Sequence, residues 1–172
     1  MKKLSLLGYS LFLLLTCLSC KNDNLLYTSF QEIKDTTWSF KDSVFFNWEI
    51  EDTTKSYTVQ LNIRHTTSYK WANIFLFSDL VFPNNKARRD TFEFYFSDDY
   101  GHWTGDKSGL LVKHKFPLYE RVKFPLKGVY RLNLNQAMRD TQLVDLMNIG
   151  IEVYTNQTCL LYTSDAADDI PR

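Results

Sequence analysis

Apolar and polar residues alternate along most of the chain, in short runs separated by polar clusters. Side chains two positions apart lie on the same face of a strand, so this period indicates β-strands with one buried face. The clearest run is 57–64, in which Tyr57, Val59, Leu61 and Ile63 alternate with polar residues. The pattern predicts strands at residues 38–40, 44–50, 57–64, 73–82, 88–96, 128–135 and 149–154.

The stretch from 101 to 127 lacks a clear period, and Pro117 and Pro125 favour loop or edge segments there. A short helix is expected around 141–147. About eight strands with mostly short connections are typical of an antiparallel β-sandwich. We therefore predict an all-β fold, a single antiparallel β-sandwich over residues 27–157. Immunoglobulin-like and jelly-roll-like topologies both fit the pattern.

The N-terminus carries an apolar run over residues 4–18, preceded by two lysines. A transmembrane helix needs about 20 apolar residues, so this run is too short and has the layout of a secretory signal. The run ends in Leu18-Ser19-Cys20 and then turns polar. This ending resembles a bacterial lipobox, whose acylated cysteine becomes the first residue of the mature chain. We expect a lipoprotein signal peptide over 1–19, lipidation at Cys20 and a lipidated tether over 20–26.

Two alternatives to lipidation at Cys20 also fit the sequence. Cys17 also follows leucines and a small hydroxyl residue, but cleavage before it would leave Leu18 next to the new terminus. The other alternative is an ordinary cleaved signal with an incidental cysteine. Acylation would hold the protein on a membrane, because each buried methylene contributes about 0.8 kcal/mol.

The remaining cysteine, Cys159, lies near the C-terminus, so the predicted sandwich is held by its core and not by disulfides. Residues 158–172 differ in composition from the body and resemble the translation of a sequencing adapter, so we expect them to be non-native. The alternative is a genuine short tail.

Composition and motifs offer little for catalysis. Lys and Arg together number 20, as do Asp and Glu, so the chain has no net positive charge that would attract nucleic acid. The histidines His65, His102 and His114 are not at metal-ligand spacing, and no HExxH motif or nucleophile elbow is present. We therefore expect no catalytic residues, metal, cofactor, nucleic acid or small-molecule substrate.

Two stretches look more specialised than scaffold. Residues 64–73 combine a cation, an imidazole, hydroxyls and two large aromatics, and residues 101–109 place a tryptophan among three glycines. Tyr, Trp and Arg dominate protein interfaces. We expect a partner-binding surface formed by Arg64, His65, Tyr69, Trp71 and Trp103. In the alternative, Tyr69 and Trp71 cap one end of the sandwich and Trp103 covers the core.

These stretches, with the blocks that follow them, resemble the GldH family of gliding-motility lipoproteins of Bacteroidetes. The matching blocks are LNIRHTTSY, NIFLF, DTFEF, GHWTGDKSG, PLYERVKFPLKGVY, QAMRD and NIGIEV, in this order between residues 38 and 153. The resemblance implies a non-enzymatic accessory role in gliding motility and type IX secretion. It also implies an outer-membrane location and contact with other Gld-type envelope lipoproteins.

Two other functions fit the residues less well. A carbohydrate-binding surface lipoprotein of a polysaccharide-uptake system would need an exposed aromatic platform built from Tyr69, Trp71, Tyr100 or Trp103. A hydrolase would need two carboxylates facing each other across a cleft.

Overall fold

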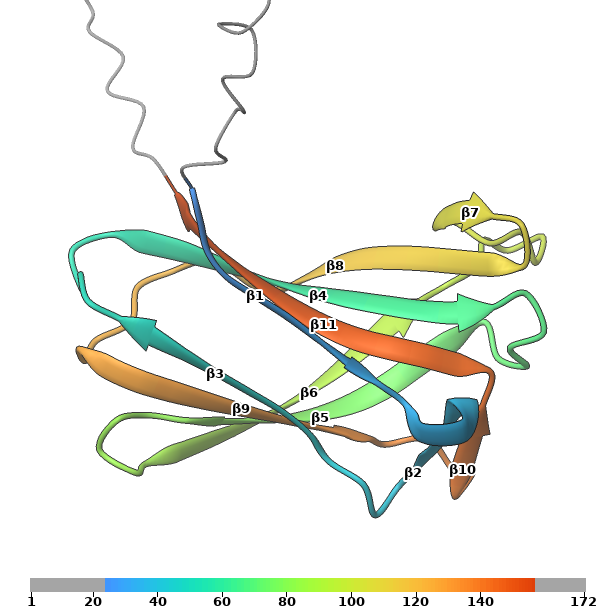
Figure 1. The fold of residues 1–172 in the computed structure, drawn as a ribbon, viewed down its shortest axis with the longest axis horizontal. Coiled ribbons are helices and arrows are strands. Elements are labelled where there is room, and N and C mark those ends of the chain that lie inside the picture. Colours follow the sequence, from blue (N-terminus) through green and yellow to red (C-terminus); the bar gives the residue numbers. More distant parts are fainter. Residues whose placement is uncertain (1–23, 157–172) are drawn as a thin grey trace, which may run out of the picture.

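The computed structural model describes residues 24–156 of the chain, and the predictions for 1–19, Cys20 and 158–172 lie outside this range. Figure 1 shows two sheets stacked face to face, and every strand pair in them is antiparallel. The predicted all-β sandwich is therefore confirmed.

One layer is a five-stranded sheet with the strand order β1-β11-β4-β8-β7. Its strands are β1 (Leu25–Glu32), β11 (Leu146–Asn156), β4 (Ser56–Thr66), β8 (Leu111–Val122) and β7 (Asp106–Ser108).

The other layer is a four-stranded sheet with the order β3-β9-β5-β6. Its strands are β3 (Val44–Ile50), β9 (Gly128–Gln136), β5 (Asn73–Val81) and β6 (Ala87–Tyr95). A short pair, β2 (Thr37–Ser39) with β10 (Gln142–Val144), and the 3₁₀ turn η1 (Lys34–Thr36) lie at one end of the sandwich (Figure 1).

The strand β4 runs the full length of the sandwich and defines its two ends. At one end Ser56 pairs with Asn156, and β1 begins beside the last residues of β11. We call this the terminal end. At the other end, the distal end, β4 finishes at Thr66 and β11 begins. Eleven residues at about 3.3 Å each separate the two ends by about 35 Å.

The core fills the space between the sheets and follows the alternation seen in the sequence. In β3 the four inward side chains are buried and the three outward ones are exposed. Trp48 stacks on Tyr130 of β9 with an interplanar angle of 12°. The largest fully buried side chains include Trp38, Phe46, Ile50, Leu61, Ile63, Ile74, Leu76, Phe96, Tyr130, Leu132, Leu134 and Leu143.

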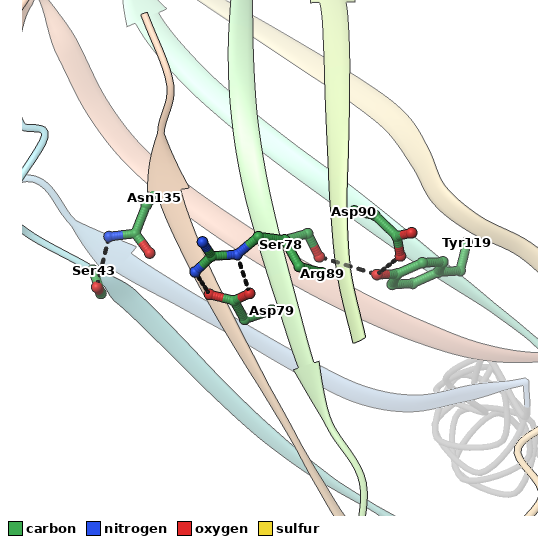
Figure 2. Close-up of polar contacts among 7 residues, drawn as sticks. All are labelled: Ser43, Ser78, Asp79, Arg89, Asp90, Tyr119 and Asn135. Atoms are coloured by element: carbon green, nitrogen blue, oxygen red, sulfur yellow. Dashed lines mark hydrogen bonds and ion pairs between the residues drawn. The ribbon is translucent and has the colours of Figure 1, made fainter. Parts of the chain in front are cut away.

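A polar bridge joins the two sheets across this core (Figure 2). The Tyr119 hydroxyl of β8 donates to the Asp90 carboxylate of β6 at 3.0 Å and lies 3.0 Å from the Ser78 hydroxyl of β5. Burial, the largest cause, raises the pKa of Tyr119 to about 12. The phenol therefore stays protonated and can donate to Asp90 at any physiological pH.

The predicted helix at 141–147 is wrong. This segment forms β10 and the start of β11, joined at Asp145, whose φ of 68° is left-handed. Leu143 is 1 % exposed and pairs with Trp38 of β2. Tertiary pairing with β2 and burial of Leu143 therefore override the local preference of this stretch.

Besides β10, the strands β1, β7 and β8 lie outside the predicted set. Residues 111–122, expected to be irregular, form the long strand β8. Pro117 is tolerated because β7 pairs only with Leu111–Lys113, so β8 is an edge strand at the proline. The strand β1 begins at Leu25, two residues inside the segment predicted to be tether.

No helix in the described part of the chain is long and apolar enough to cross a membrane.

Candidate protein-binding site

The residues predicted to form a partner-binding surface do not share one surface. His65 is 0 % exposed and Tyr69 4 % exposed, so these two cannot contact a partner and the prediction is wrong for them. Arg64, Trp71 and Trp103 are each partly exposed.

The reason for the burial of His65 is the period of β4. Tyr57, Val59, Leu61 and Ile63 point into the core, and the same alternation carries His65 inward and Arg64 outward. The alternation already visible in the sequence therefore contained the signal that separates these two neighbours.

His65 pairs with His114 of β8 inside an aromatic cage. The two Nε2 atoms are 3.0 Å apart and the rings are stacked within 11° of parallel. Phe96 stacks on both rings, and Trp103 packs edge-on against His65 with the centroids 4.7 Å apart. Trp103 thus acts as a cover over the core, as in the alternative interpretation.

The environment keeps both imidazoles neutral. His65 Nδ1 lies 2.7 Å from the Thr66 carbonyl and so carries the proton that it donates, which leaves Nε2 to accept from His114. Burial first, and then the nearby His65, lower the pKa of His114 to about 4. Burial also lowers the pKa of His65. This pair is therefore a structural element of the core.

Neither a metal site nor a sugar-stacking platform is formed by the described residues. Among residues 24–156, no three His, Cys, Asp or Glu side chains gather in a way that could hold a metal ion. The four candidate sugar-stacking rings do not form one exposed platform, because Tyr69 is buried and Trp103 packs on His65.

A hollow of about 470 Å³ opens at the distal end of the four-stranded sheet. It lies where the loop after β4 meets the loop after β9. The residues that line it are Trp71, Asn73, Phe75, Ala137, Met138, Arg139 and Asp140.

The buried side chain of Gln136, the last residue of β9, shapes one wall of the hollow. Its Oε1 accepts from the Met138 backbone N–H at 2.8 Å, and its Nε2 donates to the Asp140 carbonyl at 2.9 Å. Gln136 is 3 % exposed, so these bonds form away from water. The side chain thus holds residues 137–140 in a tight turn that leaves the sheet.

Because residues 137–140 turn away from β5, one backbone donor of β5 makes an unusual hydrogen bond. The Phe75 carbonyl still accepts from the Ala137 N–H at 2.8 Å. The Phe75 N–H, however, donates to the Met138 sulfur at 3.3 Å. A thioether is a weak acceptor, so this donor is held more weakly than it would be by a carbonyl.

The charges at the rim are only partly compensated. The Asp140 carboxylate accepts from the Trp71 indole N–H at 3.2 Å and lies 3.7 Å from the Lys70 ammonium. The same ammonium sits 4.4 Å from the centre of the Trp71 ring. The neighbouring Arg139 is exposed, and within residues 24–156 its guanidinium makes no ion pair.

An apolar patch continues from the hollow over the outer face of the four-stranded sheet. Phe77 of β5 is 39 % exposed and Tyr95 of β6 is 61 % exposed. Phe75, which lines the hollow, lies two residues before Phe77 on the same face, and Tyr95 pairs with Asn73, another lining residue. The outer side of β4, by contrast, carries polar side chains, of which Thr58, Gln60 and Arg64 are partly exposed and Asn62 is buried.

Of the seven residues that line the hollow, only Trp71 belongs to the predicted partner-binding surface. A signal for the others existed. Asn73 and Phe75 belong to the block NIFLF, and residues 137–140 belong to QAMRD. These two blocks support the family resemblance, and the fold brings them together at the hollow.

Comparison with known proteins gives a family match over nearly all of the described chain. The model of the family described as GldH lipoprotein matches residues 25–153. A gliding motility lipoprotein GldH homolog from Christiangramia forsetii is 31 % identical over 135 residues, which cover 78 % of this chain and 82 % of that protein. The gliding motility lipoprotein GldH of Flavobacterium johnsoniae is 29 % identical over 114 residues, covering 65 % of this chain and 70 % of that protein.

Among solved structures, dimeric latent PorU from Porphyromonas gingivalis matches with a TM-score of 0.33 and 13 % identity, covering 77 % of this chain and 13 % of that one. The VP2 subviral particle of infectious bursal disease virus matches with a TM-score of 0.34 and 14 % identity, covering 75 % and 32 %. At these TM-scores neither likeness supports a functional statement.

Proposed function

Because this chain belongs to the GldH lipoprotein family, we propose that it is a lipid-anchored accessory component of the gliding-motility and type IX secretion machinery. Its role is to hold other envelope lipoproteins of that machinery in an assembly at the outer membrane, without chemistry of its own. The family match across residues 25–153 is the observation that carries this proposal.

The direction of the chain supports an anchored binding module. Acylation at Cys20 would anchor the chain in the membrane a few residues before β1, and β1 begins at the terminal end. The hollow lies at the distal end, about 35 Å away along the strands. An anchored body would thus present the hollow away from the membrane surface.

The chemistry of the hollow supports binding over catalysis. Its lining contains one carboxylate, Asp140, whose oxygen is occupied by Trp71 and Lys70. A glycosidase needs two carboxylates, and a nucleophilic enzyme needs an activated Ser, Cys or Thr beside a base. The lining residues supply neither arrangement, whereas Trp, Phe, Met and Arg are typical of protein interfaces.

The proposal is tested by purifying the tagged full-length protein from its native envelope in a mild detergent. We expect other gliding-motility lipoproteins to be recovered with it. A Cys20→Ser chain, which is not acylated, is the control and should recover far less of them. Repeated recovery of the wild-type protein alone, under conditions that preserve other envelope complexes, would count against the proposed role.

A further inference from the structure

We propose that the hollow binds an extended segment of a partner protein that carries an apolar side chain and, next to it, a carboxylate. This inference rests on the proposed partner-binding role and names the chemistry that the site would recognise. Three features of the distal end carry it.

The first feature is the apolar floor. Trp71, Phe75, Ala137 and Met138 line a hollow whose volume lies within the range of about 300–1,000 Å³ typical of ligand pockets. Exposed Phe77 and Tyr95 extend the apolar surface beyond the hollow. An apolar side chain that entered the hollow would lose its contact with water, and burial of this kind drives protein association.

The second feature is charge. Lys70 and the Trp71 indole satisfy Asp140, whereas Arg139 has no ion-pair partner among residues 24–156. On the outer face of β6, Glu93 accepts from the Asn73 amide at 2.6 Å and does not line the hollow. A guanidinium presents donors that match a carboxylate in two parallel hydrogen bonds. The complementary partner is therefore acidic at this position.

The third feature is the backbone donor of Phe75. Its N–H faces the side of β5 that β9 has left and is held only by the Met138 thioether. A carbonyl oxygen is a stronger acceptor than a thioether. An extended partner segment that displaced the Met138 side chain would offer such a carbonyl and add locally to the sheet, as in strand addition to an exposed edge.

The test uses the full-length Cys20→Ser chain and fluorescein-labelled ten-residue peptides in which leucine and glutamate alternate. Matched peptides replace glutamate with lysine, or leucine with serine. Fluorescence anisotropy should show binding of the leucine–glutamate peptides and at least about tenfold weaker binding of both other sets.

Charge reversal provides the decisive variant. Arg139→Glu should weaken binding of the glutamate peptides about tenfold or more and strengthen binding of the lysine peptides. Lys127→Glu makes the same charge change at an exposed residue near the terminal end and should leave both affinities unchanged. Equal effects of the two substitutions, or no preference for glutamate over lysine in the wild type, would overturn the inference.

Two further outcomes separate this inference from the proposed function. If envelope lipoproteins still copurify undiminished with Arg139→Glu, the hollow is not their binding site and the inference fails while the proposed function stands. If the wild type recovers no partner yet binds the glutamate peptides, the proposed function fails and the inference stands. Concentration-dependent dimerisation that Arg139→Glu abolishes would assign the hollow to a second copy and overturn the inference.

Discussion

The Nε2 atoms of His65 and His114 lie 3.0 Å apart inside the core, where both rings are almost completely buried. Two protonated imidazoles could not share this position, because each would present a donor and a positive charge to the other. The pair is therefore compatible with the fold only while at least one ring is neutral. The nearby Asp145 and Asp106 carboxylates favour protonation, but less than burial opposes it.

We predict that the free energy of unfolding falls as the pH falls from about 6.5 to about 4. In this window the unfolded chain binds protons at its histidines, whereas folded His114, with a pKa of about 4, does not. Stability is thus fully present above the unfolded pKa of about 6.5 and decreases below it, by up to about 3 kcal/mol for His114. Carboxylates with a lowered pKa, such as Asp79, lose their contribution only below about pH 4.

Urea denaturation at several pH values measures this effect. His114→Gln should flatten the dependence between pH 4 and 6.5, even if it lowers stability at every pH. His102→Gln is the matched control, because the His102 side chain is 79 % exposed. Identical slopes for the wild type and His114→Gln would show that the buried pair does not cause the effect.

Tyr119→Phe should lower the free energy of unfolding by about 1–2 kcal/mol. The substitution keeps the ring but removes the hydroxyl through which β8 contacts Asp90 and Ser78 of the facing sheet (Figure 2). Tyr100→Phe removes a hydroxyl from a side chain that is 87 % exposed and should change stability by less than about 0.5 kcal/mol. Equal denaturation midpoints for the two variants would contradict a stabilising role for the bridge.

Gly150→Ala should destabilise the protein by about 1–3 kcal/mol. Phe30 of β1 lies directly over Gly150 on the outer face of the five-stranded sheet, and an added Cβ would overlap its ring. In a Phe30→Ala background the same substitution should cost much less, because the overlap is gone. A double-mutant cycle by urea denaturation measures this coupling, and strictly additive effects would show that the two residues act independently.

Cys20→Ser should move the protein from the membrane fraction to the soluble fraction and abolish its labelling by palmitate. Cys17→Ser should change neither property, because we expect Cys17 to be removed with the signal peptide. Fractionation and metabolic labelling in the native host measure both. Loss of labelling in Cys17→Ser with retention in Cys20→Ser would assign the anchor to the other cysteine.

The fold class could be predicted from the sequence because one-sided burial leaves a period of two in strands such as β3 and β4. The strand at 142–144 could not, because its structure depends on Trp38, more than a hundred residues earlier in the chain. The hollow could not be predicted from local sequence patterns either. It depends on the point at which β9 leaves β5, and Gln136 sets that point through hydrogen bonds within its own turn.

The course of β1 also determines how the body would respond to mechanical load. The strand starts at the terminal end and runs toward the distal end beside β11, paired from Leu25 to Glu32. A pull on the anchor, opposed by a partner held at the hollow, would act along this strand. The hydrogen bonds between β1 and β11 would then share the force simultaneously in shear, and would not open one after another as in unzipping. With the proposed anchor and a partner bound at the hollow, such a body would transmit tension along β1 without opening its pairing one bond at a time.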